Sequence, residues 1–511
     1  MLLNIKTKNL QNFINFFNIE QTMDELSRRR FSNCLFEALD QQGYSIGRIK
    51  KRSNSLSDLL EWTFASISGS REAIFGGSRE AIFAGSAGEG IAKLFSSDLD
   101  GIVVYKGLVC VDEGHTEDGL LVARNEFSQT PPGYVRLQVD DSSYSFPITE
   151  NWLPTSVADG KRYLDSEATK YLLKVDFDSA DQFAMDSEIN GPAVTSLPRY
   201  NYLFYRIPET LKNIDSIRFE TDCVLGLQFY SSKILEKWLS RERYHEWPSK
   251  ELQDKIGAMN GYVVPVGHKF SPNKNVEWRI SYTTAEKKLV RNMNNVQVKL
   301  YVVFKFIRKE RLKPVCPNFT SYMVKNLVFW VLELTPESEF TPHNLVEIIM
   351  SALRILKRFL TNNVLPCYMI PERNLLVERM NEGERKALLG VVECFIAEDY
   401  EFILKNHKLS LFMQINYSDP ELAKNFALWI AEIEDLCWIL FEGLHIGRHL
   451  SPFPELLINA CISGLGMKEL LTFVRLVLLI IPRNDFITYI RNGDMESIPR
   501  IFWNTLKNVL S

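Results

Sequence analysis

The stretch that decides the fold is residues 85–100, with the sequence GSAGEGIAKLFSSDLD. It begins with a short glycine-containing turn at Gly85 and Ser86, and after a gap of eleven residues it reaches Asp98 and Asp100. An apolar, strand-like run follows directly. Because side chains alternate between the two faces of a strand, Asp98 and Asp100 are expected to point the same way.

Two carboxylates that converge on one point repel each other unless a cation lies between them. Hard oxygen ligands suit Mg²⁺ or Mn²⁺, and small residues ahead of the pair let backbone N–H groups approach phosphate oxygens. The spacing resembles the nucleotidyltransferase signature, in which a Gly-Ser pair precedes an acidic-apolar-acidic triplet. The alternative is a glycine loop before an ordinary strand whose acids are solvated.

The bulk composition is that of a globular protein. At 511 residues the chain suggests two or more domains or lobes. Its hydrophobic content of 46% and charged content of 24% are ordinary for a soluble protein. The net charge of −4 argues against a generally basic nucleic-acid binder but leaves room for a local basic face.

The cysteines are dispersed and form no Cys-x-x-Cys pair. This favours reduced thiols in the cytosol over a disulfide framework or a zinc ribbon. The first residues lack the continuous apolar core of a signal peptide. The longest apolar run, near 470–481, is interrupted by Arg475 and is too short to cross a bilayer. We therefore expect a cytoplasmic protein that does not bind membranes.

Hydrophobic periodicity predicts an α+β protein whose front half is mixed and whose back half is mostly helical. Strand-like segments occupy 101–111, 134–139, 217–229 and 262–265. Helical segments occupy 285–310, 319–335, 343–363 and 384–399. The expected domains are an N-terminal helical segment, a catalytic core, a helical lobe and a C-terminal helical extension, at 1–66, 67–284, 285–380 and 381–511.

A tandem duplication precedes the decisive stretch. Residues 69–76 have the sequence GSREAIFG and residues 77–84 have GSREAIFA, so the Gly-Ser pair occurs three times, eight residues apart. Only Gly85-Ser86 lies at the right distance from the aspartates. We interpret the repeat itself as a local duplication in a loop or helix start.

A two-metal site usually has a third carboxylate from a neighbouring strand. Asp222 lies in the strand-like run Arg218 to Leu227 and could supply it. A single aspartate in a strand is weak evidence for a metal ligand, and the assignment of Asp222 depends on the other motifs.

Several motifs in series resemble the male-abnormal (Mab) domain proteins, and within them the cyclic GMP-AMP synthase-like receptors. The resemblance covers roughly residues 60 to 380. Besides the Gly-Ser and Asp-Leu-Asp motifs it includes Pro132 to Leu137, Asp222-Cys223-Val224, Trp247-Pro248, Glu277 to Glu286, Ser321 to Lys325, Leu365 to Pro371 and Asn374-Leu375-Leu376.

The resemblance implies a bilobal nucleotidyltransferase fold with the substrate cleft between the lobes. It implies Asp98, Asp100 and Asp222 as catalytic metal ligands and Gly85 and Ser86 at the triphosphate. It also implies nucleotide-binding roles for Arg279, Ser281, Glu286, Ser321 and Tyr322, with Tyr322 stacked on a base. Without the resemblance, Trp278-Arg279 is an amphipathic strand and Tyr322 a helix core residue.

The chain departs from the vertebrate synthase, which has a zinc-binding His-Cys-Cys-Cys insertion in its helical lobe. No His or Cys lies between Glu286 and Lys313, so we expect no zinc and a DNA-sensing mode is in doubt. The basic residues Arg48, Lys50, Lys51 and Arg52 could form a phosphate-binding stripe. Double-stranded RNA is therefore the expected activator.

The resulting hypothesis is a pattern-sensing enzyme that makes a cyclic dinucleotide, such as cyclic GMP-AMP, from ATP and GTP for innate immune signalling. Ligand-induced dimerisation is a further expectation. Two alternatives remain open, a non-catalytic scaffold or binding module and another template-free nucleotidyltransferase.

Overall fold

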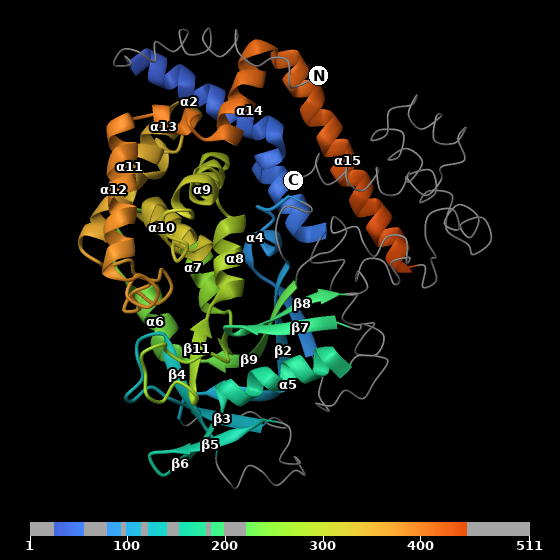
Figure 1. Cartoon of the computed structure of the whole chain (residues 1–511), viewed down its shortest axis with the longest axis vertical. Coiled ribbons are helices and arrows are strands. Elements are labelled where there is room, and N and C mark those ends of the chain that lie inside the picture. Colours follow the sequence, from blue (N-terminus) through green and yellow to red (C-terminus); the bar gives the residue numbers. More distant parts are fainter. Residues whose placement is uncertain are drawn as a thin grey trace, which may run out of the picture.

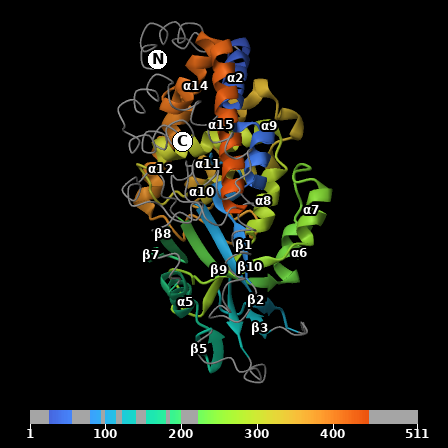
Figure 2. The same ribbon diagram turned by 90° about the vertical axis from the view of Figure 1, so that its right-hand side faces the viewer.

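The computed structural model describes residues 25–55, 79–93, 99–113, 121–139, 153–179, 185–198 and 221–446. Within this part the strands gather at one end of the molecule and most helices at the other (Figure 1). A view turned by 90° shows the same separation (Figure 2). The α+β class is confirmed.

The strands of the described part join into one eleven-stranded sheet, in the order β1-β2-β3-β4-β11-β10-β9-β8-β7, with β6 paired to β4 and β5 to β6. An additional pairing of β2 with β9 closes β2, β3, β4, β11, β10 and β9 into a ring. The strands are β1 (Arg79–Phe83), β2 (Leu99–Val111), β3 (Leu121–Glu126), β4 (Tyr134–Gln138), β5 (Thr155–Ala158), β6 (Lys161–Leu164), β7 (Met185–Asn190), β8 (Ala193–Pro198), β9 (Thr221–Tyr230), β10 (Gly261–Val264) and β11 (Glu277–Ser281).

The long strand β2 is the centre of this sheet. Its first half lies between β1 and β9 and its second half between β3 and β9, with a shift of register between Tyr105 and Val109. Ile102, Val103 and Val104 are all buried, as expected of a strand covered on both faces. The predicted strands at 101–111, 134–139 and 262–265 are confirmed, as is the described part of the one at 217–229.

The helices follow mainly in the second half of the chain. They are α2 (Glu25–Leu39), the π-helical turn η2 (Asp40–Tyr44), α4 (Gly85–Gly88), α5 (Ser166–Ser179), α6 (Ser232–Ser240), α7 (Lys250–Gly257), α8 (Thr283–Arg291), α9 (Asn295–Ile307), η7 (Arg308–Leu312), α10 (Ser321–Leu334), η8 (Glu337–Glu339), η9 (Pro342–Asn344), α11 (Leu345–Thr361), α12 (Glu382–Glu398), α13 (Glu401–Leu404), α14 (His407–Ser418) and α15 (Pro420–Ile446). Residues 46–55 are also helical, and we call them the basic segment.

The helical patterning predicted over 285–310 is confirmed, with a break at 292–294 that divides it into α8 and α9. Asn294 starts α9 with a capping box: its side chain accepts from the backbone of Gln297, and the Gln297 side chain accepts from the backbone of Asn294. The predicted helices at 319–335, 343–363 and 384–399 are confirmed as α10, α11 and α12.

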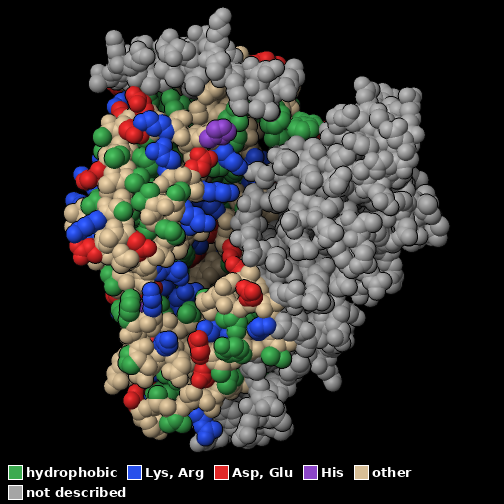
Figure 3. All heavy atoms as spheres, viewed as in Figure 1, with side chains coloured by type: hydrophobic (Ala, Val, Ile, Leu, Met, Phe, Trp, Pro, Cys, Tyr) green, Lys and Arg blue, Asp and Glu red, His purple; other side chains and the backbone are tan. Residues whose placement is uncertain are grey.

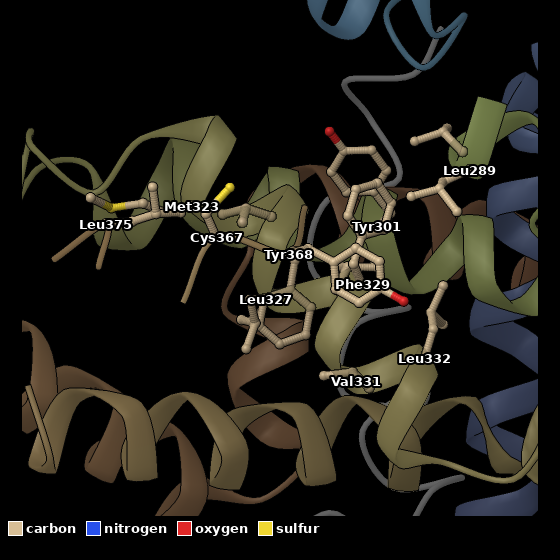
Figure 4. Close-up of a cluster of buried hydrophobic side chains, with 14 of the residues drawn as sticks. Leu289, Tyr301, Met323, Leu327, Phe329, Val331, Leu332, Cys367, Tyr368 and Leu375 are labelled. Atoms are coloured by element: carbon tan, nitrogen blue, oxygen red, sulfur yellow. The ribbon is translucent and has the colours of Figure 1, made fainter. Parts of the chain in front are cut away.

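The helical end has a continuous apolar core. Figure 4 shows Tyr301 from α9, Leu327 from α10 and Tyr368, which follows α11 in the chain, within one cluster of buried side chains. All three side chains are buried, as is Leu289 of α8. This packing fixes α9 and α10, which carry several of the candidate site residues.

The N-terminal segment packs on the C-terminal elements. The ring of Phe31 lies 5.2 Å from that of Tyr400, and Arg28 pairs with Asp399. The expected border between core and helical lobe at 284/285 falls inside α8. The domain limits at 1–66, 67–284, 285–380 and 381–511 otherwise remain predictions. Among the described residues, no helix is both long and apolar enough to cross a membrane.

Candidate active site

The turn expected at Gly85 is a four-residue helix, α4, packed against the start of β2. The N–H of Ala84 donates to the carbonyl oxygen of Asp100 over 2.9 Å. Gly85 has a φ of 58°, and a Cβ at this position would lie 1.8 Å from Oδ2 of Asp100. Only glycine allows this approach of loop and carboxylate.

The residues after Ser86 explain why the third Gly-Ser pair occupies this position. A Cβ on Gly88 would lie 2.5 Å from the carbonyl oxygen of Phe83, and one on Gly90 would lie 2.1 Å from that of Ile49. The corresponding positions after the second Gly-Ser pair are Glu80 and Ile82, which cannot fit there.

The duplicated segment is a strand in its second copy, where Arg79–Phe83 forms β1. The expectation of a loop or helix start is therefore wrong for this copy, because β1 pairs antiparallel with β2 and completes the sheet edge. The first copy lies outside the described residues.

Two of the three predicted metal ligands lie on neighbouring strands. Asp100 and Asp222 are register partners across the parallel pair β2 and β9. The hydroxyl of Thr195 donates to Oδ1 of Asp222 over 2.6 Å. Asp98 lies outside the described residues, and among the described ones no cluster of three or more metal-binding side chains occurs.

The side chains where Asp100 and Asp222 meet are suited to a hard cation. Burial, together with the carboxylates of Asp222 and Asp100, raises the pKa of the neighbouring Cys223 thiol to about 12. The thiol therefore stays protonated and leaves only carboxylate oxygens as ligands. Oxygen ligands without thiolate suit Mg²⁺ or Mn²⁺ rather than zinc.

A buried ionic network joins residues 85–90, which we call the glycine loop, to the helical end of the molecule. Lys325 of α10 lies 3.0 Å from Oε1 of Glu89 and 2.6 Å from Oε2 of Glu286. All three side chains are buried. Burial alone would lower the pKa of Lys325, but the two carboxylates outweigh it and raise this pKa. Glu286 thus makes its strongest contacts inside the protein.

Helix α9 adds two residues that the sequence reasoning did not single out. The Tyr301 hydroxyl donates to Oε2 of Glu89 over 3.1 Å. One turn later, the Lys305 ammonium lies 5.8 Å from the centre of the Tyr301 ring. Burial lowers the pKa of Lys305 to about 8, although the fields of Glu89 and Asp100 favour its charge. A lysine within the apolar run of α9 was the available signal.

Lys305 makes no ion pair with any described residue, in contrast to Lys325. Lys305 is half-buried. A half-buried ammonium that lacks a described ion-pair partner favours the approach of an anion. Lys305 lies against the Tyr301 ring, whose hydroxyl bonds Glu89 of the glycine loop, and it feels the charges of Glu89 and Asp100.

Besides the network around Lys325, the site has a second region of cationic side chains, which contains Arg279 and Arg373. On β11, Trp278 is buried and its indole N–H donates to the carbonyl oxygen of Leu164, while Arg279 faces the other way. Burial, assisted by the charge of Arg373, lowers the pKa of Arg279 to about 10. Arg373 already bonds Glu378 over 2.7 and 2.8 Å. The strand interpretation of Trp278-Arg279 is confirmed.

Tyr322 connects the two regions. Its hydroxyl donates to Oε1 of Glu286 over 2.9 Å and lies 3.4 Å from Sγ of Cys367. Ser321 is exposed at the start of α10, and the Ser281 hydroxyl bonds that of Thr283 over 2.7 Å. The fold thus brings Tyr322 to Glu286, while the nucleotide contacts of these residues remain predictions.

The four basic residues of the predicted stripe are mostly engaged inside the protein. Arg52 is buried; it donates to the carbonyl oxygen of Gly90 over 2.8 Å and pairs with Glu434 over 3.0 Å. Arg48 pairs with Glu434 as well. The expectation of an open stripe is wrong for Arg52, because α15 covers it. Lys50 and Lys51 are exposed.

Comparison with known proteins gives a partial match. Residues 288–394 match the family described as the Mab-21 protein HhH/H2TH-like domain. A cyclic GMP-AMP synthase-like receptor of Nicrophorus vespilloides is 27% identical over 148 residues, which are 29% of this chain and 35% of that protein. The match thus spans about a third of the relative's length.

The domain match crosses the border expected at 380 and ends within α12. It includes α9 and α10, from which Lys305, Tyr322 and Lys325 come. The domain match and the relative confirm the resemblance drawn from the sequence motifs: the chain is similar to a cyclic GMP-AMP synthase-like receptor with a Mab-21 protein HhH/H2TH-like domain.

Proposed function

We propose that this chain is a metal-dependent nucleotidyltransferase with a bilobal fold that joins ATP and GTP into a cyclic dinucleotide such as cyclic GMP-AMP. The observation that carries the proposal is the contact of Gly85 with Asp100, which is in register with Asp222. It combines a loop that can approach phosphate with carboxylates that can hold Mg²⁺ or Mn²⁺.

In this proposal Asp100, Asp222 and Asp98 hold the cations. Bound Mg²⁺ or Mn²⁺ would neutralise the charge of the triphosphate and lower the pKa of the ribose hydroxyl that attacks the α-phosphorus in line, with pyrophosphate as the leaving group. The chain's own part is to bind and orient. Backbone N–H groups of the loop at Gly85 and Ser86 meet the triphosphate.

The ammonium of Lys305, which makes no ion pair with a described residue, offers a counter-charge to the same triphosphate. Arg279 and Tyr322 hold the bases, one through its guanidinium and the other through its ring face. Ser281, Ser321 and Glu286 complete the nucleotide contacts. On the surface, a hollow separates the helical end from the strand end, and Lys and Arg side chains gather beside it (Figure 3).

A non-catalytic scaffold remains the second candidate. It has no need for a half-buried lysine that makes no ion pair with a described residue near a glycine loop and carboxylates, so Lys305 favours the enzyme. A different template-free nucleotidyltransferase would share these features and differ only in its product.

The activator in this proposal is double-stranded RNA, acting in the cytoplasm and inducing a dimer, and its product would signal in antiviral defence. The relative's printed name, a receptor, supports the sensing part. The absence of a His-Cys-Cys-Cys insertion supports RNA over DNA.

The test is direct. Purified protein is incubated with ATP, GTP and Mg²⁺ or Mn²⁺, with and without long duplex RNA or DNA, and the products are identified by mass spectrometry. A cyclic dinucleotide supports the proposal, a linear oligonucleotide supports the other transferase, and no product with bound nucleotide supports the scaffold.

A further inference from the structure

Helix α15, the last of the described helices, lies beyond the matched domain and contacts the basic segment (residues 46–55) through carboxylates. Asp435 lies 2.7 Å from Nη1 of Arg48 and 2.8 Å from Nζ of Lys51. Glu434 pairs with both Arg48 and Arg52. Three of the four cations of the expected phosphate-binding stripe are therefore neutralised by two residues of one helix.

We propose that α15 is an internal competitor for a duplex nucleic acid: Glu434 and Asp435 occupy the basic segment, and a duplex that binds there must displace them. Carboxylates and phosphates have the same charge and accept the same guanidinium hydrogen bonds. The carboxylate of Asp435 and a phosphate group therefore cannot occupy Arg48 and Lys51 at the same time. The inference rests on the proposed function only in taking double-stranded RNA as the nucleic acid that binds.

The interface between α15 and the N-terminal segment is suited to separation. A cavity of about 150 Å³ lies there, lined among others by Gly43, Arg48, Lys424 and Glu434. Asp435 and Lys51 are partly solvent-exposed. Water and ions can thus reach the Asp435–Lys51 pair, and such a pair exchanges more readily than the buried Glu434–Arg52 pair.

The same contact reaches the candidate active site. Arg52, held by Glu434, donates to the carbonyl oxygen of Gly90 at the end of the glycine loop. The hydroxyl of Ser53 donates to the carbonyl oxygen of Gly88. Displacement of Glu434 therefore changes the surroundings of a guanidinium that anchors the loop, and this links occupancy of the basic segment to the loop's position.

The test compares two single-charge variants of α15. Asp435→Asn removes the carboxylate that pairs with Arg48 and Lys51. Glu421→Gln removes an exposed carboxylate in the first turn of the same helix. Affinity for long duplex RNA is measured by fluorescence anisotropy at near-physiological salt. We expect Asp435→Asn to bind roughly threefold to tenfold more tightly than wild type, and Glu421→Gln to differ little.

Two further measurements test whether the gain in RNA affinity comes from the contact between α15 and the basic segment. In a Lys51→Ala background the gain from Asp435→Asn should shrink, because one of the two released cations is gone. Hydrogen exchange over residues 430–436 of the wild-type protein should rise when duplex RNA saturates it. Equal affinities of the two variants, or unchanged exchange over 430–436 at saturation, would overturn the proposal.

Nucleotidyl transfer with and without duplex RNA, measured on the same preparations, separates this inference from the proposed function. If RNA displaces α15 and no product forms, the competitor stands and the enzyme assignment fails. If product forms but RNA leaves α15 protected, the enzyme assignment stands and the competitor fails.

Discussion

A Cβ atom on residue 85 would lie 1.8 Å from Oδ2 of Asp100, so the glycine loop and the candidate metal ligand touch only because residue 85 is glycine. The positive φ of Gly85, 58°, adds a second reason for glycine. The glycine loop and β2 are thereby positioned as one unit. A substitution in either should displace the other.

Gly85→Ala should therefore lower nucleotidyl transfer by about 100-fold or more, because an ångström-scale displacement of a reacting group has that effect. It should also weaken Mn²⁺-dependent ATP binding in calorimetry. Gly47→Ala is the matched control, since a Cβ there meets nothing within 4 Å. Wild-type binding in Gly85→Ala would contradict the assigned position of the loop.

Ser86→Ala should weaken triphosphate binding only modestly, since one neutral hydrogen bond contributes roughly 0.5–1.5 kcal/mol. Ser78→Ala, in the second Gly-Ser pair, should leave ATP affinity unchanged. If both variants lose the same affinity, the wrong Gly-Ser pair has been assigned to the site.

Asp222→Asn should reduce turnover by roughly two to three orders of magnitude, on the order of 3–4 kcal/mol in the barrier. The fold should survive, because the amide oxygen still accepts the hydrogen bond from Thr195. Thr195→Val, which leaves the carboxylate in place, is the control and should lose much less. Substantial turnover in Asp222→Asn would refute the metal assignment; thermal unfolding of each variant reports the fold.

The sequence could predict β2, because its apolar run is long and its flanking acids alternate. It could not predict that Asp100 and Asp222 are register partners, since pairing depends on the whole sheet. The break between α8 and α9 was visible in the capping residues Asn294 and Gln297, but apolar periodicity continues across it.

The basic segment shows a different limit. Arg52 is part of a charge cluster in the sequence, and such clusters usually mark solvated faces. Its partner Glu434 lies far along the chain, so only tertiary structure reveals that Arg52 is buried. Lys305 was missed for the converse reason: a lysine within an apolar helix is a weak signal by itself, and its meaning comes from the charges of Glu89 and Asp100.

Lys325→Met should destabilise the protein by about 3–5 kcal/mol at neutral pH, because it leaves Glu89 and Glu286 buried without their shared cation. In the wild type the folded-state pKa of Lys325 is raised above its unfolded value. The stability that it contributes is therefore complete below the unfolded value of about 10.5 and is lost as the pH rises above it.

Chemical denaturation at several pH values measures this effect. The loss in Lys325→Met should shrink in acid, where protons can neutralise the two carboxylates. Adding Glu89→Gln to Lys325→Met should recover part of the stability. A variant as stable as wild type at pH 7 would show that the network is not formed in solution.

Lys305→Met should have the opposite effect on stability and a damaging effect on substrate binding. Burial lowers the pKa of Lys305 to about 8, so its charged form is disfavoured in the folded protein. Replacing it by an apolar side chain of similar length should stabilise the protein at pH 7 by about 1–2 kcal/mol.

The sign of the pH dependence follows from the same pKa. Between pH 8 and about 10.5 the unfolded chain keeps a proton that folded Lys305 has lost, so the free energy of unfolding of the wild type rises with pH in this window. The advantage of Lys305→Met over wild type should therefore be largest below pH 8 and should shrink above it. Denaturation of both proteins across this range measures the difference.

The same Lys305→Met variant should bind ATP roughly tenfold to 100-fold more weakly, the loss expected of one hydrogen bond between charged groups. Lys299→Met is the matched control on α9, because Lys299 pairs with Asp40. It should destabilise the protein and leave ATP affinity near that of wild type. An unchanged ATP affinity in Lys305→Met would exclude the ammonium from the triphosphate site and would remove the observation that favours an enzyme over a scaffold.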